Sequence, residues 1–146
     1  AWLNDPKLLV LDEPTAGLDP NERIRFRNLI SRLGRDRIVI LSTHIVSDVE
    51  YIASTILTMK NGQIIHRGRI DEVIAAIEGK IFECLVDRKT ADRLMADYPV
   101  INVREESGKT LLRLAADFPP CETAVSVPAT LEDLYLYYFS READKK

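Results

Sequence analysis

Residues 8–13 of this 146-residue chain place a short apolar run directly before two carboxylates. Leu-Leu-Val-Leu leads into Asp12 and Glu13, and an unbroken apolar run of this length is typical of a buried parallel strand. In open α/β sheets, ligands bind outside the carboxyl ends of the strands, where adjacent carboxylates can serve a metal ion and an attacking water. The stretch therefore predicts an α/β fold with a nucleotide-type site at the end of its first strand.

The next segment predicts a loop, a helix and a second strand. Residues 14–19 are rich in turn formers, and Asp19 can cap a helix by forming a capping box with Glu22. Residues 38–41 form another short apolar run, so strand, helix and strand make a parallel crossover. The helix between them has one apolar stripe at helical spacing: Phe26, Leu29, Ile30 and Leu33.

Four polar residues near the two strand ends are the candidates for chemistry. Asp12 could orient a magnesium ion, and Glu13, on the opposite side of the chain, could address a water. His44 follows the second strand and could hydrogen-bond a terminal phosphate. Each also has a structural explanation: a solvated loop for the two acids, a structural histidine for His44, and a helix cap for Asp19.

The rest of the chain predicts a hairpin and then a small α+β domain. A helix at 47–53 precedes a hairpin across Asn61-Gly62, and a further helix spans 71–77. We expect one domain over residues 1–79 and a second over 80–146, built as a sheet with helices on one face. The elements expected in the second domain are a strand at 80–86, a helix at 90–97, a hairpin of 100–104 with 110–114, an edge strand at 123–127, and a helix after a capping box of Thr130 and Asp133.

Composition and charge exclude several classes of function. The net charge of −3 is spread evenly over both halves, which predicts no nucleic-acid partner, and the spacing of Arg23, Arg25 and Arg27 favours a solvated surface over a phosphate site. Cys84 and Cys121 stand alone in the sequence, so we expect reduced thiols in the core. No apolar run approaches the roughly 20 residues that cross a bilayer, so a membrane role requires a partner.

Taken jointly, these motifs resemble the nucleotide-binding domain of ATP-binding cassette (ABC) transporters. Residues 8–13 look like the Walker B strand with its catalytic glutamate, residues 16–19 like the D-loop, and residues 42–44 like the switch-histidine loop. The resemblance extends to about Ile77. It implies a partial P-loop NTPase (RecA-like) parallel sheet.

The resemblance also implies roles, cofactors and partners. Asp12 would support Mg²⁺ through water, Glu13 would be the general base, His44 would contact the γ-phosphate of ATP, and Asp19 would reach across a dimer. The implied partners are a second copy of the ATPase subunit and an integral-membrane permease. The implied location is cytoplasmic, at the inner face of the membrane.

The segment from Lys80 onward is similar to an accessory domain found on cassette ATPases of the drug and antibiotic exporter type. The similarity includes the closing sequence Pro-Ala-Thr-Leu-Glu-Asp-Leu-Tyr at residues 128–135. From this we expect an exporter, with the tail acting as a dimer contact or a regulator.

Three family motifs are absent from the sequence: the phosphate loop GxxxxGK[ST], the glutamine loop and the signature motif. We therefore interpret the chain as the C-terminal part of such an ATPase, with residues 1–3 as the remnant of the signature helix, and expect it to be inactive alone. Its sheet should show an unpaired edge and an uncovered apolar face. The alternatives are a soluble, non-transport cassette ATPase and a non-catalytic regulatory or dimerisation module.

Overall fold

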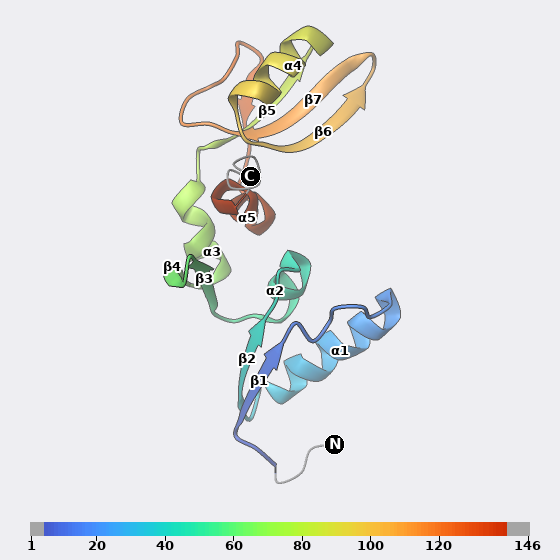
Figure 1. Cartoon of the computed structure of the whole chain (residues 1–146), viewed down its shortest axis with the longest axis vertical. Coiled ribbons are helices and arrows are strands. Elements are labelled where there is room, and N and C mark those ends of the chain that lie inside the picture. Colours follow the sequence, from blue (N-terminus) through green and yellow to red (C-terminus); the bar gives the residue numbers. More distant parts are fainter. Residues whose placement is uncertain (1–4, 140–146) are drawn as a thin grey trace. The chain divides into compact units, whose positions relative to one another are not determined.

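The computed structural model of the chain describes residues 5–139, which divide into two compact units between residues 56 and 57 (Figure 1). The expected signature-helix remnant at residues 1–3 lies outside the described residues. No helix between residues 5 and 139 is long and apolar enough to span a bilayer.

The first unit is a strand–helix–strand–helix arrangement. Its elements are β1 (Leu8–Asp12), α1 (Pro20–Leu33), β2 (Ile38–Ser42) and α2 (Val46–Ile52). The two strands pair in parallel, so the predicted α/β class is confirmed. The predicted start of α1 is also confirmed, because Asp19 Oδ1 accepts from the backbone N–H of Glu22 at 2.9 Å and the reciprocal bond completes the capping box.

One face of the β1–β2 sheet is apolar and exposed. Exposure alternates along both strands, and the parallel register places the exposed side chains opposite one another. The predicted uncovered face is thus confirmed, while the expectation of a strand buried on both faces is wrong, since nothing in residues 5–139 covers this side. The four apolar side chains, with their exposed fractions, are Leu8 (52%), Val10 (68%), Ile38 (67%) and Ile40 (52%).

A tight hairpin, β3 (Ile56–Lys60) with β4 (Gln63–Gly68), follows the first unit. Asn61 and Gly62 connect the strands with φ values of 51° and 76°. Two consecutive positive φ angles are what a type I′ turn requires, so the prediction from the Asn-Gly pair is confirmed. The helix predicted over 71–77 divides into α3 (Ile70–Ile74) and a 3₁₀ turn η1 (Ala75–Ile77).

A four-stranded antiparallel sheet forms most of the second unit. Its strands are β5 (Ile81–Val86), β6 (Val100–Glu106), β7 (Lys109–Ala115) and β8 (Ala124–Ser126), in the order β6-β7-β5-β8. The short β8 lies at an edge, as predicted. The intervening helix α4 (Arg88–Asp97) begins earlier than the predicted residue 90, because Asp87 caps it by accepting from the N–H of Thr90 at 2.9 Å.

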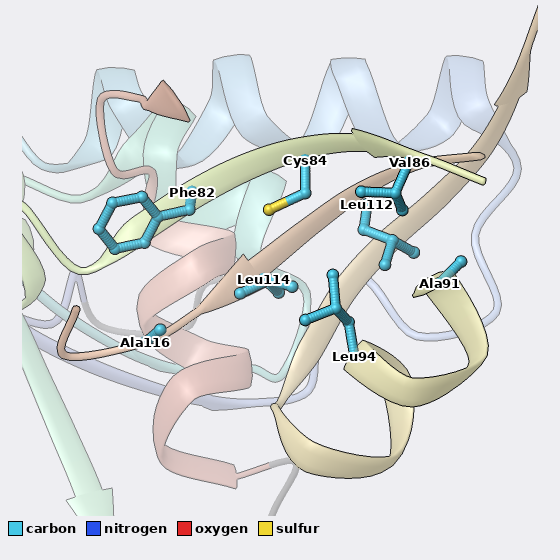
Figure 2. Close-up of a cluster of buried hydrophobic side chains, with 8 residues drawn as sticks. All are labelled: Phe82, Cys84, Val86, Ala91, Leu94, Leu112, Leu114 and Ala116. Atoms are coloured by element: carbon cyan, nitrogen blue, oxygen red, sulfur yellow. The ribbon is translucent and has the colours of Figure 1, made fainter. Parts of the chain in front are cut away.

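Helix α4 and the two central strands enclose the apolar core of this sheet (Figure 2). Alternate residues of β5 and β7 point toward the helix, and the helix contributes Ala91 and Leu94. The strand and loop residues of the cluster are Phe82, Cys84, Val86, Leu112, Leu114 and Ala116.

The last helix, α5 (Leu131–Phe139), is attached to the opposite face of the sheet. Arg113 lies between Leu112 and Leu114 on β7, so its side chain leaves the other face, where it contacts Asp133 at 2.7 Å and Glu83 at 3.1 Å. The expectation of helices on one face only is therefore wrong for α5. Burial by itself would raise the pKa of Asp133, but hydrogen bonds from Arg113 and Thr130 outweigh it and lower that pKa.

Helix α5 also contacts the hairpin. Lys60 Nζ donates to the backbone carbonyl of Tyr138 at 2.6 Å, and the rings of His66 and Tyr138 lie 4.9 Å apart. The hairpin and the four-stranded sheet consequently fall in one compact unit. The functional boundary between residues 79 and 80 stays a prediction.

The exposed face of the first unit predicts self-association of the isolated chain. Val10→Lys should weaken this association about tenfold, because it removes about 1.5 kcal/mol of apolar burial and introduces a charge. Sedimentation velocity over a concentration series measures the effect. Val125→Lys, at an exposed valine on β8 (61%), is the matched control; a wild-type chain that stays monomeric throughout the series would contradict the prediction.

Candidate functional site

The carboxyl ends of β1 and β2 meet through Ser42. The register pairs Asp12 with Ser42, whose hydroxyl donates to Asp12 Oδ1. The backbone N–H of Glu13 donates to the Ser42 carbonyl at 3.0 Å and faces the Ser42 hydroxyl oxygen at 3.3 Å. One serine therefore holds both predicted acidic residues at the sheet edge.

Glu13 and His44 are in direct contact. Glu13 has a φ of +43°, a left-handed conformation uncommon for a residue with a side chain, and it turns the backbone away from the strand direction. Its Oε1 accepts from the backbone N–H of His44 at 3.1 Å and lies 2.9 Å from His44 Nδ1. Because a carboxylate oxygen can only accept, the contact requires the proton on Nδ1.

The second oxygen of Glu13 has a different environment. Oε2 is buried and has no hydrogen-bond partner among the described residues. A buried acceptor without a donor is costly, and such groups are expected to bind a water or a ligand. The carboxylate thus has one oxygen fixed by His44 and one buried oxygen without a donor among residues 5–139.

Asp19 shares no hydrogen bond with the other three candidate residues among residues 5–139. Its carboxylate caps α1, and within residues 5–139 no hydrogen bond joins it to Asp12, Glu13 or His44. The structure thus brings three of the four sequence-predicted residues together. The fourth has the structural role that the sequence also allowed.

A buried polar network behind the site was missed by sequence reasoning. Asp48, on α2, is fully buried; it accepts from the hydroxyl of the buried Thr15 and forms an ion pair with Arg27 of α1. Arg27 also donates to the Ser47 hydroxyl at 3.1 Å, and its guanidinium lies 5.6 Å from the centre of the Tyr51 ring. The predicted solvated surface is therefore wrong for Arg27.

The network connects the two segments that contain the candidate residues. Thr15 lies two residues after Glu13, and Asp48 lies four residues after His44. Burial alone would raise the pKa of Asp48, but hydrogen bonds from Thr15 and Arg27 and the positive charge of Arg27 outweigh it, so the pKa falls below its ordinary value. The charged form of Asp48 is the one that the fold stabilises.

The oxygen atoms at the strand ends fit a magnesium ion held largely by water. Asp12 is exposed and offers a carboxylate next to the Ser42 hydroxyl, and Mg²⁺ commonly binds through one or two carboxylates while keeping several waters. Between residues 5 and 139 no group of three His, Cys, Asp or Glu side chains gathers as a complete metal site.

Comparison with known proteins identifies relatives of the chain. The Nod factor export ATP-binding protein I of Rhizobium etli is 33% identical over 99% of the chain, a match that covers 49% of that protein. Its namesake in Paraburkholderia xenovorans is 31% identical over 97% of the chain and is covered over 50% of its length. The chain is homologous to a C-terminal part of ABC transporter ATP-binding proteins.

A third relative matches a shorter part of the chain. An uncharacterized ABC transporter ATP-binding protein of Bacillus subtilis, YxlF, is 34% identical over 61% of the chain and is covered over 30% of its length. No family model matches the chain. The chain spans about half the length of the curated ABC relatives that it matches over nearly its whole length.

The buried network predicts a large loss of stability in Asp48→Ala. Removing one partner of a buried ion pair leaves Arg27 without its countercharge, so we expect the free energy of unfolding to fall by about 3 kcal/mol. Urea denaturation at neutral pH measures this loss. Glu50→Ala, at an exposed position of the same helix, is the control and should change the free energy by less than about 0.5 kcal/mol.

The same carboxylate predicts the direction of a pH effect. Because the pKa of Asp48 is lower in the folded state, its contribution is fully present above the unfolded-state pKa of about 3.9. The contribution is lost as the pH falls below that value. The difference in stability between wild type and Asp48→Ala should therefore shrink on acidification below about pH 4; a constant difference would contradict the assignment.

Proposed function

We propose that this chain is the C-terminal part of the ATPase subunit of an ABC exporter. The complete protein would couple ATP binding and hydrolysis to transport through an integral-membrane permease. The main observation in support is the Glu13–His44 contact at the end of β1, where one carboxylate oxygen is fixed and the other has no donor among the described residues. The homology to ABC transporter ATP-binding proteins supports the ATPase assignment.

In this proposal, Glu13 acts on the attacking water and His44 contacts the terminal phosphate. Glu13 Oε2 has no donor between residues 5 and 139 and would accept a proton from the water, which is the task of a general base. His44 would keep its Nδ1–H on Glu13, and its Nε2 would face the terminal phosphate of ATP. The backbone N–H and the Nδ1 of His44 both contact Glu13 Oε1, and these two contacts would hold the base in one orientation.

Asp12 and Asp19 have supporting roles in the proposal. Asp12, oriented by the Ser42 hydroxyl, would hold the waters around Mg²⁺, and bound Mg²⁺ would neutralise charge on the phosphates. Asp19 would contact a second copy of the ATPase subunit while it continues to cap α1. Nothing in its capping geometry requires both carboxylate oxygens, because the described cap bond uses Oδ1.

Export and membrane attachment are proposed from the relatives. Two of the relatives are named as export ATP-binding proteins, and we propose the same direction for this chain, at the inner face of the membrane. A soluble cassette ATPase acting on nucleic acid is less well supported, because the charges are evenly spread. Co-purification of the complete protein with a membrane permease would distinguish the two functions.

Glu13→Gln in the complete protein should lower kcat for ATP hydrolysis by about 10²- to 10⁴-fold, because the amide cannot accept the proton of the water. Steady-state phosphate release measures the effect. Glu22→Gln is the matched control, since glutamine preserves the capping box and should leave kcat unchanged. Equal loss in both variants, or none in either, would overturn the catalytic role and favour a non-catalytic regulatory or dimerisation module.

Residues 1–146 alone should bind Mg²⁺-ATP with a Kd above about 1 mM and should not hydrolyse it. The sequence has no GxxxxGK[ST] loop, so no backbone N–H cradle and no lysine surround the β- and γ-phosphates. Isothermal titration calorimetry measures the affinity. A saturable binding curve at micromolar nucleotide would contradict this prediction.

A further inference from the structure

The two cysteines, distant in sequence, come together in the second unit. Cys84 lies in the middle of β5 and is completely buried, with its sulfur inside the apolar cluster (Figure 2). In the pairing of β5 with the edge strand β8, Cys84 lies opposite Ala124. Cys121 lies just before β8, in a turn closed by the hydrogen bond from Ala124 N–H to its carbonyl at 3.1 Å.

The side chain of Cys121 completes this arrangement. It is partly buried and packs against the cluster that contains Cys84. The sequence offered no sign of the pairing, because the residues do not form a CxxC motif. The antiparallel pairing of β5 with β8 and the tight turn together produce it.

We propose that Cys84 and Cys121 form an oxidation site that closes to an intramolecular disulfide. Cys121 packs against the cluster that contains Cys84, and its carbonyl is bonded to Ala124, the register partner of Cys84, so the two sulfurs need little movement to reach the S–S distance of about 2.05 Å. The bond would link β5 to the turn before β8. It would secure the short edge strand to the strand next to it.

The two cysteines have different roles in this reaction. Cys121 is the accessible thiol, and its sulfur also lies 3.3 Å from the Thr123 hydroxyl oxygen. Burial, with a further contribution from the neighbouring Cys121, raises the pKa of the Cys84 thiol to about 12, so Cys84 is a poor first nucleophile. We therefore assign the first step to Cys121 and the closing step to Cys84.

A hydroperoxide is the oxidant class that balances the reaction. The Cys121 sulfur attacks hydrogen peroxide, the O–O bond breaks, and Cys121 becomes a sulfenic acid with release of one water. The Cys84 sulfur then attacks the Cys121 sulfur, the S–O bond breaks, and the second water leaves with the thiol proton of Cys84. The two thiols together lose two electrons, and the peroxide gains them.

The test uses the reduced chain treated with hydrogen peroxide. We expect the two free thiols per chain to disappear, the intact mass to fall by the two lost hydrogens, and a peptide map without reductant to show a Cys84–Cys121 link. The melting temperature should rise on oxidation and return with dithiothreitol, because the bond restricts the unfolded chain. An oxygen adduct on Cys121 without the link, or links only between chains, would overturn the proposal.

Single-cysteine variants separate the two steps. In Cys84→Ser the sulfenic acid on Cys121 should persist and react with dimedone, and no stabilisation should follow oxidation. In Cys121→Ser the remaining buried thiol of Cys84 should react with hydrogen peroxide at least about tenfold more slowly than Cys121 does in the wild-type chain. Cys121→Ser alters the more exposed position and serves as the informative variant if Cys84→Ser does not fold. Rapid oxidation of Cys84 in the Cys121→Ser variant would contradict the assigned order.

Discussion

The buried charge of Asp48 is the constraint on which the first unit depends. A carboxylate removed from water is stable only when it is paired and hydrogen-bonded, and here Arg27 and Thr15 supply both requirements. Asp48 and these two partners come from three different segments, so satisfying one charge fixes α1, α2 and the loop after β1 together. The positions of Glu13 and His44 follow, because each lies within four residues of a member of this network.

A second constraint acts at the strand ends themselves. Adjacent acids at one sheet edge repel each other, and the fold offsets this repulsion with donors from β2 and the residues after it. The Ser42 hydroxyl serves Asp12, while the backbone and imidazole of His44 serve one oxygen of Glu13. The parallel register is therefore part of the site, because a shift of one residue would move Ser42 away from Asp12 and turn its side chain to the other face.

The features that the sequence predicted well are those determined within a few residues. The capping box of Asp19 with Glu22 and the Asn61-Gly62 turn both depend on local hydrogen bonds and backbone angles, and both are present. The Walker B and histidine motifs were recognisable for a related reason: their residues follow directly from two short strands. The structure then showed that these strand ends meet, whereas the chemical roles of the residues stay predictions.

The two largest features that the sequence did not predict, the burial of Arg27 and the sheet face that α5 contacts, depend on pairing between distant segments. Arg27 has the same local pattern as its exposed neighbour Arg25, and only α2 distinguishes them by placing Asp48 beside one of them. Arg113 likewise pairs with Asp133 of α5 on the face of the sheet opposite to α4, against the expectation of a single covered face. In each case a charged side chain is removed from water because it pairs with an opposite charge far away in the sequence. Helical or strand periodicity does not predict such pairs. Long-range electrostatic pairing therefore acts together with apolar burial, such as that of Leu131 and Leu134 in α5, to fix the parts of this fold that position its candidate site and its last helix.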